Sequence, residues 1–459
     1  MTIESPSQTL SAEAIIIDLA HKMVNPLKVK AIVLESTNKN PAIDQFPWSD
    51  CSLSHGFPAL VSFYAHLDEY YPDQKWDLAA HEYVLQIAAS IESDGIHDYS
   101  LFGGLSGICW ALLQASKNKT RYQKLLQTLN KELVEAVNNY YLLPMKEDVQ
   151  KKIPSGVQLY DLIQGIVGIG SYMLQDMHHP LFYETLISVT HTLIERCRLI
   201  DVEGYRVPGW YVPNSFQFTE QDIQLFPKGN FNLGLAHGVP GILSFLAIAY
   251  AQGICLDHQV ETMQYIADWL INKNCGDKNA PRWRDRVSFE EETGNIPSKA
   301  TMHRDAWCYG TPGVARSLYL AGQALNDHSL KPFATQAFKM IFHRSEDEWG
   351  LISPTFCHGI VGLLAVTHRM AQDTEDPILI AQTVHLKQKL INSFDTALPF
   401  GFQDLEPLTF QKGALKLDYM GVNKAGLLEG AAGIGLGLLG ISRNNAIWDT
   451  PFLINGGTP

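Results

Sequence analysis

Apolar and polar residues alternate along this chain with the period of α-helices. Short, almost continuous apolar runs occupy residues 108–113, 242–249 and 363–366. Stretches between such runs, including 121–136 and 259–271, carry apolar residues three and four positions apart, the spacing of one face of a helix. The pattern predicts helical hairpins, each pairing an apolar helix with an amphipathic one.

A recurrent glycine pair stands where each apolar run begins. The first glycine occurs at seven places: Gly56, Gly104, Gly165, Gly238, Gly310, Gly359 and Gly430. A second glycine follows three residues later in every copy except the first, which has Ala59. The spacings are 48, 61, 73, 72, 49 and 71 residues, so a unit of about 48 residues carries insertions in several copies. Seven hairpins, or about fourteen helices, are predicted.

The glycine-started helices favour an all-α fold, a closed α/α toroid, over an open solenoid. Glycine permits tight turns and close backbone approach, which suits inner helices crowded around one axis. Apolar inner runs also leave little polar face for an open groove. The residues just before each first glycine then line one mouth of the ring: His55, Gly103, Gln164, His237, Tyr309, His358 and Glu429. A purely structural scaffold does not need so many titratable groups there.

Two cysteines and a histidine occupy equivalent places in neighbouring copies. Cys308 and Cys357 each stand two positions before a first glycine, and His358 follows Cys357 directly. Two thiolates and an imidazole suit zinc, and three protein ligands leave the fourth tetrahedral position open for chemistry. The sequence therefore predicts one Zn²⁺ held by these three side chains.

Composition narrows the possible partners and compartments. The chain is 46% hydrophobic and 18% charged, with a net charge of −13 and no basic run, which argues against a nucleic-acid partner. Its seven cysteines are odd in number and scattered, as in a reducing compartment. The N-terminus has no basic region of a secretory signal, and the most apolar segment, 430–441, is too short to span a bilayer. A cytoplasmic protein without a transmembrane segment is expected.

Three stretches interrupt the helical pattern within what we treat as a single toroid domain, residues 1–459. Residues 140–160 contain two prolines and a charged cluster, 201–232 are aromatic-rich and strand-like, and 272–303 are polar and loop-like. Insertions of this length are often functional. We expect residues 201–232 and 272–303 to form a small accessory element that captures or covers a substrate.

Several segments together resemble the LanC-type lanthipeptide cyclases, the lanthionine synthetase C family. They are 160–168 (YDLIQGIVG), 232–241 (NLGLAHGVPG), 304–310 (RDAWCYG) and 357–359 (CHG), with 209–213 (GWYVP) and 226–230 (FPKGN). The resemblance covers nearly the whole chain. It implies a toroid with one catalytic zinc and a small, β-rich, SH2-like extension, which we place in the insertions.

The family also implies a substrate and partners. The substrate is a precursor peptide, leader plus core, whose serines and threonines have been dehydrated. The implied neighbours are a dehydratase and an ABC transporter, which places the chain in the cytoplasm and peripherally at the inner membrane face.

The reaction that the resemblance implies adds a peptide cysteine to the β-carbon of dehydroalanine or dehydrobutyrine. Only a thiolate is a competent nucleophile, and zinc binding deprotonates a thiol. His237 would protonate the α-carbon of the resulting enolate. Asp161 would orient His237 or accept the thiol proton. Arg304 and Tyr309 would donate hydrogen bonds to the enolate oxygen.

Three other functions remain open from the sequence. A zinc-dependent thiol transferase or glutathione-binding protein, similar to the eukaryotic LanC-like branch, would keep the metal ligands without cyclase activity. A glycosidase would need opposed carboxylates, for which Asp161 and Glu429 are candidates, but would leave the two cysteines unexplained. A non-catalytic scaffold would only present the precursor to other enzymes.

Overall fold

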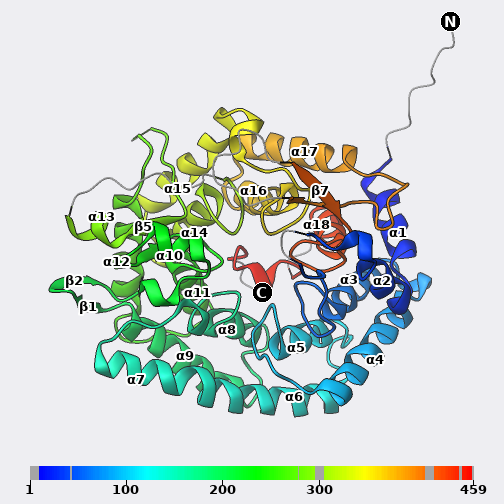
Figure 1. Ribbon diagram of the computed structural model, residues 1–459, viewed down its shortest axis with the longest axis horizontal. Helices are drawn as coiled ribbons and strands as arrows, with labels where there is room; N and C mark the ends of the chain where they lie inside the picture. The colour runs from blue at the N-terminus through cyan, green and yellow to red at the C-terminus, as the bar shows by residue number, and fades with distance from the viewer. Residues whose placement is uncertain are drawn as a thin grey trace, which may run out of the picture.

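Seven helices stand around a common axis, and each begins at the residue after one of the recurrent glycines (Figure 1). The computed structural model describes residues 10–41, 44–277, 279–294, 304–408, 418–443 and 447–456. Within them the inner helices are α3 (Phe57–Tyr70), α5 (Leu105–Gln114), α8 (Ile166–Leu174), α11 (Val239–Ala251), α14 (Thr311–Ala324), α16 (Ile360–Thr374) and α18 (Ala431–Arg443). Each contacts the next, and α18 contacts α3, so the ring is closed.

A second layer of helices covers the outside of the ring (Figure 1). Six of them follow their inner partners in the chain: α4 (Trp76–Asp94), α6 (Gln123–Ala136), α9 (Phe182–Arg196), α12 (Gln259–Asn272), α15 (Leu330–Lys339) and α17 (Pro377–Asn392). The seventh, α1 (Ala12–Lys22), comes from the other end of the chain and packs on α18. The predicted toroid of seven hairpins is therefore confirmed, with one hairpin made from both ends of the chain.

Glycine is required at two contacts that build the ring. Gly310 has a φ of +97°, in the left-handed region, and a Cβ there would lie 1.8 Å from the carbonyl oxygen of Arg304. In α18, a Cβ on Gly435 would lie 2.6 Å from the ring of Phe63 in α3. The two helices that close the ring thus approach each other too closely for a larger residue.

The accessory insertions form small sheets, as the sequence predicts. β1 (Leu199–Val202) and β2 (Tyr205–Pro208) make an antiparallel hairpin. β3 (Tyr211–Val212), β4 (Asn230–Asn232) and β5 (Arg286–Ser288) form a second sheet in that order. Because β5 belongs to the second insertion and pairs with β4 of the first, the two insertions meet in one element. Short helices α10 (Glu220–Leu225) and α13 (Phe289–Gly294) accompany them, and residues 278 and 295–303 lie outside the described part.

Residues 140–160 break the helical pattern only in their second part, since the helix in their first part ends at Lys151, and the expectation is wrong for the first part. A π-helical turn, η3 (Val137–Leu142), leads directly into α7 (Leu143–Lys151) on the outside of the ring. Pro144 comes two residues after this π-helical turn, inside a helical stretch that continues without a break from α6 through η3 into α7. Proline has no backbone N–H to donate to the preceding turn, and the helix changes to π-type hydrogen bonding just before it instead of ending there.

One further hairpin was not anticipated from the sequence. β6 (Asp404–Pro407) and β7 (Tyr419–Val422) pair antiparallel between α17 and α18, and residues 409–417 between them lie outside the described part. The remaining elements are α2 (Pro26–Val33) and the short helical turns η1 (Ser36–Asn38), η2 (Pro72–Gln74), η4 (Val157–Leu159), η5 (Asn214–Phe216), η6 (Met340–His343) and η7 (Glu346–Trp349). Among the described helices, none combines the length and apolarity needed to cross a membrane.

The C-terminal segment, residues 447–456, lies in the middle of the ring and includes η8 (Thr450–Phe452) (Figure 1). Trp307 Nε1 donates to the carbonyl oxygen of Phe452 over 3.0 Å. Buried Asp449 accepts from Arg369 Nε over 2.6 Å and from its terminal nitrogen over 2.7 Å. This segment, which we call the central plug, ties several inner helices together from inside the ring.

Candidate metal centre and its surroundings

Cys308 and Cys357 meet in the turns that precede α14 and α16. The backbone N–H of Cys308 donates to the carbonyl oxygen of Cys357 over 3.3 Å, which joins adjacent turns of the ring. The thiol of Cys357 hydrogen-bonds to the sulfur of Cys308 and lowers the pKa of Cys308, and the charge of nearby Arg304 acts in the same direction. The same contact raises the pKa of Cys357, which keeps the shared proton. A thiolate therefore forms more readily at Cys308 than at an isolated cysteine.

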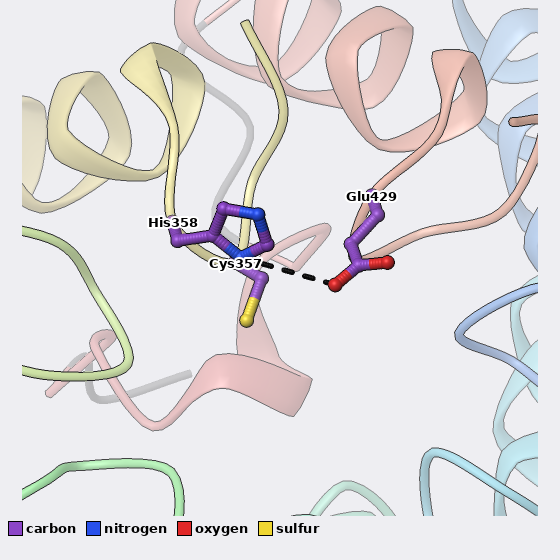
Figure 2. Close-up of side chains that lie close together, drawn as sticks. All are labelled: Cys357, His358 and Glu429. Carbon is purple, nitrogen blue, oxygen red and sulfur yellow. Dashed lines mark ion pairs between the residues drawn. The ribbon is translucent and has the colours of Figure 1, made fainter. Parts of the chain in front are cut away.

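His358 and Glu429 extend the group around Cys357 (Figure 2). Ligand atoms of Cys357, His358 and Glu429 lie within 4.8 Å of one another. His358 Nδ1 is 3.8 Å from Glu429 Oε1, and its Nε2 is 4.0 Å from Asp404 Oδ1. Sulfur, imidazole and carboxylate atoms are the ligands that Zn²⁺ takes in proteins, and Cys308 adds a second sulfur through its contact with Cys357. This donor set fits zinc.

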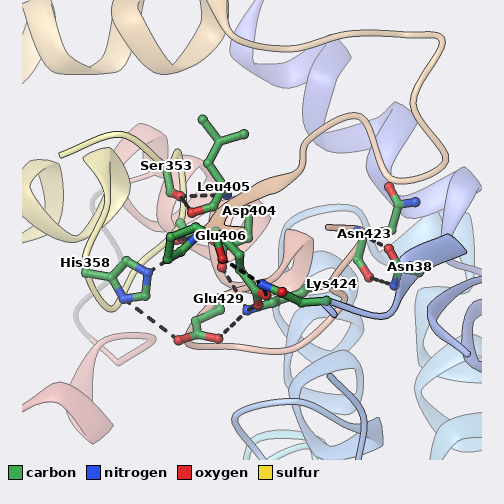
Figure 3. Close-up of polar contacts among 12 residues, drawn as sticks. Asn38, Ser353, His358, Asp404, Leu405, Glu406, Asn423, Lys424 and Glu429 are labelled. Atoms are coloured by element: carbon green, nitrogen blue, oxygen red, sulfur yellow. Dashed lines mark hydrogen bonds and ion pairs between the residues drawn. The ribbon is translucent and has the colours of Figure 1, made fainter. Parts of the chain in front are cut away.

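A buried lysine organises the acidic side of this group (Figure 3). The ammonium nitrogen of Lys424 lies 2.8 Å from Asp404, 2.5 Å from Glu406 and 2.6 Å from Glu429. Burial works against its charge, but the three carboxylates raise the pKa of Lys424 above its usual range. Burial likewise opposes ionisation of Glu429, yet the charge of Lys424 lowers its pKa to about 2. We call Lys424 with these three carboxylates the lysine cluster.

His237 and Asp161 form a second pair, in the turns before α11 and α8. Asp161 is buried, and its Oδ2 lies 2.5 Å from His237 Nδ1. Its other oxygen, Oδ1, accepts from the backbone N–H groups of Gln164 over 2.6 Å and Gly165 over 3.0 Å. A carboxylate with this support accepts a hydrogen bond from His237, so Nδ1 carries the proton and Nε2 is left for other partners.

Tyr309 lies between the two groups, and Arg304 lies near the two thiols. The ring of Tyr309 is 6.3 Å from that of His237, and Tyr309 follows Cys308 in the chain. Burial raises the pKa of Tyr309 to about 12, and its oxygen accepts a hydrogen bond from Asn232 Nδ2 over 3.0 Å. The phenol therefore stays protonated and keeps its own proton to donate. Arg304 is close enough to both thiols for its charge to lower their pKa values.

An open cavity of about 940 Å³ lies where the accessory element meets the ring. Aromatic side chains from separate segments line it, including Tyr99, Tyr140, Phe216 and Phe218. Tyr99 and Tyr140 stack with their ring centroids 5.6 Å apart. Phe218 also lies 4.9 Å from the ring of His237, so this aromatic cavity leads to the His237–Asp161 pair.

Comparison with known proteins places this architecture in a family. Residues 47–453 match the family described as lanthionine synthetase C-like protein. The chain belongs to this family. A lanthionine synthetase C-like relative, the nisin biosynthesis protein NisC of Lactococcus lactis subsp. lactis, is 26% identical over 341 residues, which cover 72% of this chain and 76% of NisC. The solved structure of nisin cyclase matches with a TM-score of 0.73 and 21% identity, over 94% of this chain and 97% of that one.

The predicted family and the toroid are thus confirmed, and with the family the class of enzyme, a lanthionine synthetase. The individual site residues stay predictions, although the structure gathers them: Cys308 contacts Cys357, and His358 adjoins Cys357. His237 binds Asp161.

Sequence reasoning missed the lysine cluster of this lanthionine synthetase C-like chain. Glu429 did have a signal, because it occupies the same place before a glycine as His358. For Lys424 and Asp404 the sequence carries no signal beyond the long spacing between Gly359 and Gly430.

Proposed function

We propose that this chain closes thioether rings in a dehydrated lanthipeptide precursor, with one Zn²⁺ held by Cys308, Cys357 and His358. The reaction adds a peptide cysteine to dehydroalanine or dehydrobutyrine and leaves lanthionine or methyllanthionine. The observation that carries the proposal is the contact between the Cys308 and Cys357 thiols beside His358, in a chain of the lanthionine synthetase C-like family.

The proposed metal suits these residues and this chemistry. When bound, zinc would make the thiol of the substrate available as a thiolate at neutral pH. Two cysteine sulfurs donate electron density strongly, which favours a reactive bound thiol over formation of hydroxide. Glycoside hydrolysis, by contrast, would not need the paired cysteines.

His237 would supply the proton that the addition requires. A carbon–sulfur bond forms at the β-carbon, the carbon–carbon double bond opens, and the α-carbon takes a proton. No oxidant or reductant is needed, because the proton lost by the thiol balances the one gained by carbon. Asp161 holds Nδ1 of His237, so Nε2 is the atom that would deliver the proton.

Tyr309 and Arg304 would stabilise the negative charge that develops on the carbonyl oxygen of the acceptor residue. Tyr309 has a proton to donate, since its oxygen already accepts from Asn232 and burial keeps the phenol neutral. Arg304 supplies a positive charge beside the thiols. Donors fixed in advance are worth most where charge appears only during the reaction.

The aromatic cavity supports a peptide as the substrate. It is larger than a single amino acid requires, lies open to solvent and reaches His237 through Phe218. We place the precursor, core and leader, along this side of the ring. A dehydratase that supplies the substrate and an ABC transporter that exports the product are the proposed partners. A cytoplasmic location suits the seven free cysteines. A peripheral position at the inner membrane face is proposed only because of the transporter.

The test is incubation of purified protein with a dehydrated precursor, with and without a metal chelator. Ring closure leaves the mass unchanged, so the readout is loss of thiols that react with an alkylating reagent. We expect thiols to disappear only when metal is present. Persistent thiols with the metal-loaded protein would refute cyclase activity, and glutathione consumption in their place would favour the thiol-transferase alternative.

A further inference from the structure

Lys424 is buried in the lysine cluster, directly beside the proposed metal ligands. Its side chain is 5% exposed, and its ammonium group contacts one oxygen each of Asp404, Glu406 and Glu429. The mechanism gives this cluster no role. The three carboxylates lie close enough together to bind a metal cation. The ammonium group of Lys424 already provides the positive charge between them.

Glu429 faces in two directions. Its Oε2 lies 2.6 Å from Lys424, while its Oε1 lies 3.8 Å from His358 Nδ1. The same carboxylate is within 4.8 Å of the ligand atoms of both Cys357 and His358. A small side-chain movement would therefore make Glu429 a ligand of a metal held by Cys308, Cys357 and His358.

Such a ligand would change the kind of site. Zinc with four protein ligands is typical of structural sites, whereas catalytic sites keep one position for water or substrate. Two sulfurs, an imidazole and a carboxylate would fill all four positions. The incoming thiol would then have to displace Glu429.

We propose that Lys424 is a positioning residue that retains Glu429 and so keeps the fourth position of the metal open for the substrate thiol. The inference rests on the proposed metal site. If Glu429 moved onto the metal, its Oε2 would lose the short contact with the buried ammonium group of Lys424. While that contact holds, only Oε1 of Glu429 faces His358. Lys424 also fixes Asp404, which accepts from Thr355 Oγ1 over 3.2 Å and faces His358 Nε2. A carboxylate in that place orients a metal-binding histidine.

The test uses Co²⁺ in place of zinc, because its visible absorption reports the number and kind of ligands. The probe for the open position is N-acetylcysteine, titrated into the Co²⁺-loaded protein. Wild type should change its sulfur-to-cobalt absorption as the thiol binds. Lys424→Met should bind Co²⁺ at least severalfold more tightly and require at least tenfold more thiol for the same change. Lys424→Met/Glu429→Gln should recover the wild-type thiol response.

Two further variants keep the test decisive. Lys339→Met removes a lysine from a less buried pair, with Asp376 at 2.9 Å on the outer helices, and should leave both titrations unchanged. Glu429→Gln alone should change the affinity for Co²⁺ by less than twofold. This measurement tests the proposal even if the Lys424→Met protein does not fold. A tenfold weaker affinity would mean that Glu429 is already a ligand, and the proposal would be wrong.

Failure of this inference is distinguishable from failure of the proposed function. A Lys424→Met protein whose thiol response equals that of wild type, or a double variant without recovery, overturns the role of Lys424 and leaves the cyclase intact. Retention of Co²⁺ by Cys308→Ala overturns the metal site and the role of Lys424 together.

Discussion

Asp161 uses its two carboxylate oxygens for different purposes. Oδ1 accepts two backbone N–H groups at the start of α8, and Oδ2 holds the ring of His237. The first contact stabilises the turn, and the second sets which nitrogen of His237 carries the proton. One residue therefore links local folding to the proposed proton transfer, and two substitutions can separate these effects.

Asp161→Asn should remove the control over the tautomer of His237 and preserve the stabilisation of the turn before α8. The amide oxygen still caps the turn, but its NH₂ group would face Nδ1 of His237 and favour the wrong tautomer. We expect kcat to fall about 100-fold or more, with little change in KM, because proton transfer contributes factors of this size. Thiol loss measured against pH and substrate concentration provides the check.

Asp161→Ala should in addition lower the free energy of unfolding by about 1 kcal/mol, the typical cost of a lost cap. Urea denaturation of both variants compares the two effects. Wild-type kcat in Asp161→Asn would show that His237 needs no fixed tautomer.

Cys308→Ala and Cys357→Ala should each lose the metal. Removing a ligand should weaken zinc binding by more than the roughly 100-fold that loss of a supporting residue produces. Metal content after dialysis, measured by atomic absorption, is the readout. The matched control is Cys197→Ala, since burial raises the pKa of that thiol to about 12 and it lies on the outer helix layer. Equal zinc in all three variants would contradict the assignment.

From the sequence, the proximity of two side chains could be predicted where each precedes a recurrent glycine. Cys308 and Cys357 could be paired in advance because the repeat places both before the same turn. Lys424 and Asp404 could not, since Asp404 begins β6 and Lys424 follows β7 by two residues, at a hairpin that no repeat contains. The contact joins residues 20 positions apart in the chain, and no periodic pattern predicts it.

At the scale of elements, the accessory sheets and the ring build the aromatic cavity jointly. Phe216 and Phe218 come from the first insertion, and Tyr140 from the η3 turn that precedes α7. The sequence predicted the strand-like character of residues 201–232 but not the helix at 143–151. The reason is that a π-helical turn just before Pro144 lets the helix continue through a residue that usually interrupts one.

Tyr140→Ala and Phe216→Ala should weaken binding of the precursor without affecting chemistry. Both side chains are exposed to solvent, Tyr140 by 61% and Phe216 by 41%. We expect KM to rise roughly tenfold for each, about 1.4 kcal/mol, as for a central aromatic contact in an interface, with kcat unchanged. Tyr183→Ala, an exposed tyrosine of α9, serves as the control. Unaltered KM in both cavity variants would place the peptide elsewhere.

On the scale of the whole molecule, stability depends on contacts that span the ring. The central plug reaches across the axis, and its most buried ionic contact joins Asp449 to Arg369 of α16. Neither partner is near the other in the chain, so the repeat pattern gave no indication of this contact. A buried arginine deprived of its carboxylate is among the most destabilising changes available.

Asp449→Ala should lower the free energy of unfolding by about 3 kcal/mol, because it removes the carboxylate that accepts two hydrogen bonds from the buried guanidinium of Arg369. Urea denaturation followed by circular dichroism measures the change. Glu147→Ala breaks the exposed pair with Lys151 on α7, and should cost about 0.5 kcal/mol or less. Equal effects of the two variants would mean that the plug contributes little to stability.

The seam between α3 and α18 has a consequence for biosynthesis. α3 is among the first helices to leave the ribosome, whereas its neighbour α18, with Gly435 set against Phe63, is among the last. During most of translation the nascent chain must therefore carry an uncovered apolar flank on α3. Partly folded chains with such surfaces aggregate readily, so chaperone binding is expected at this flank until α18 emerges.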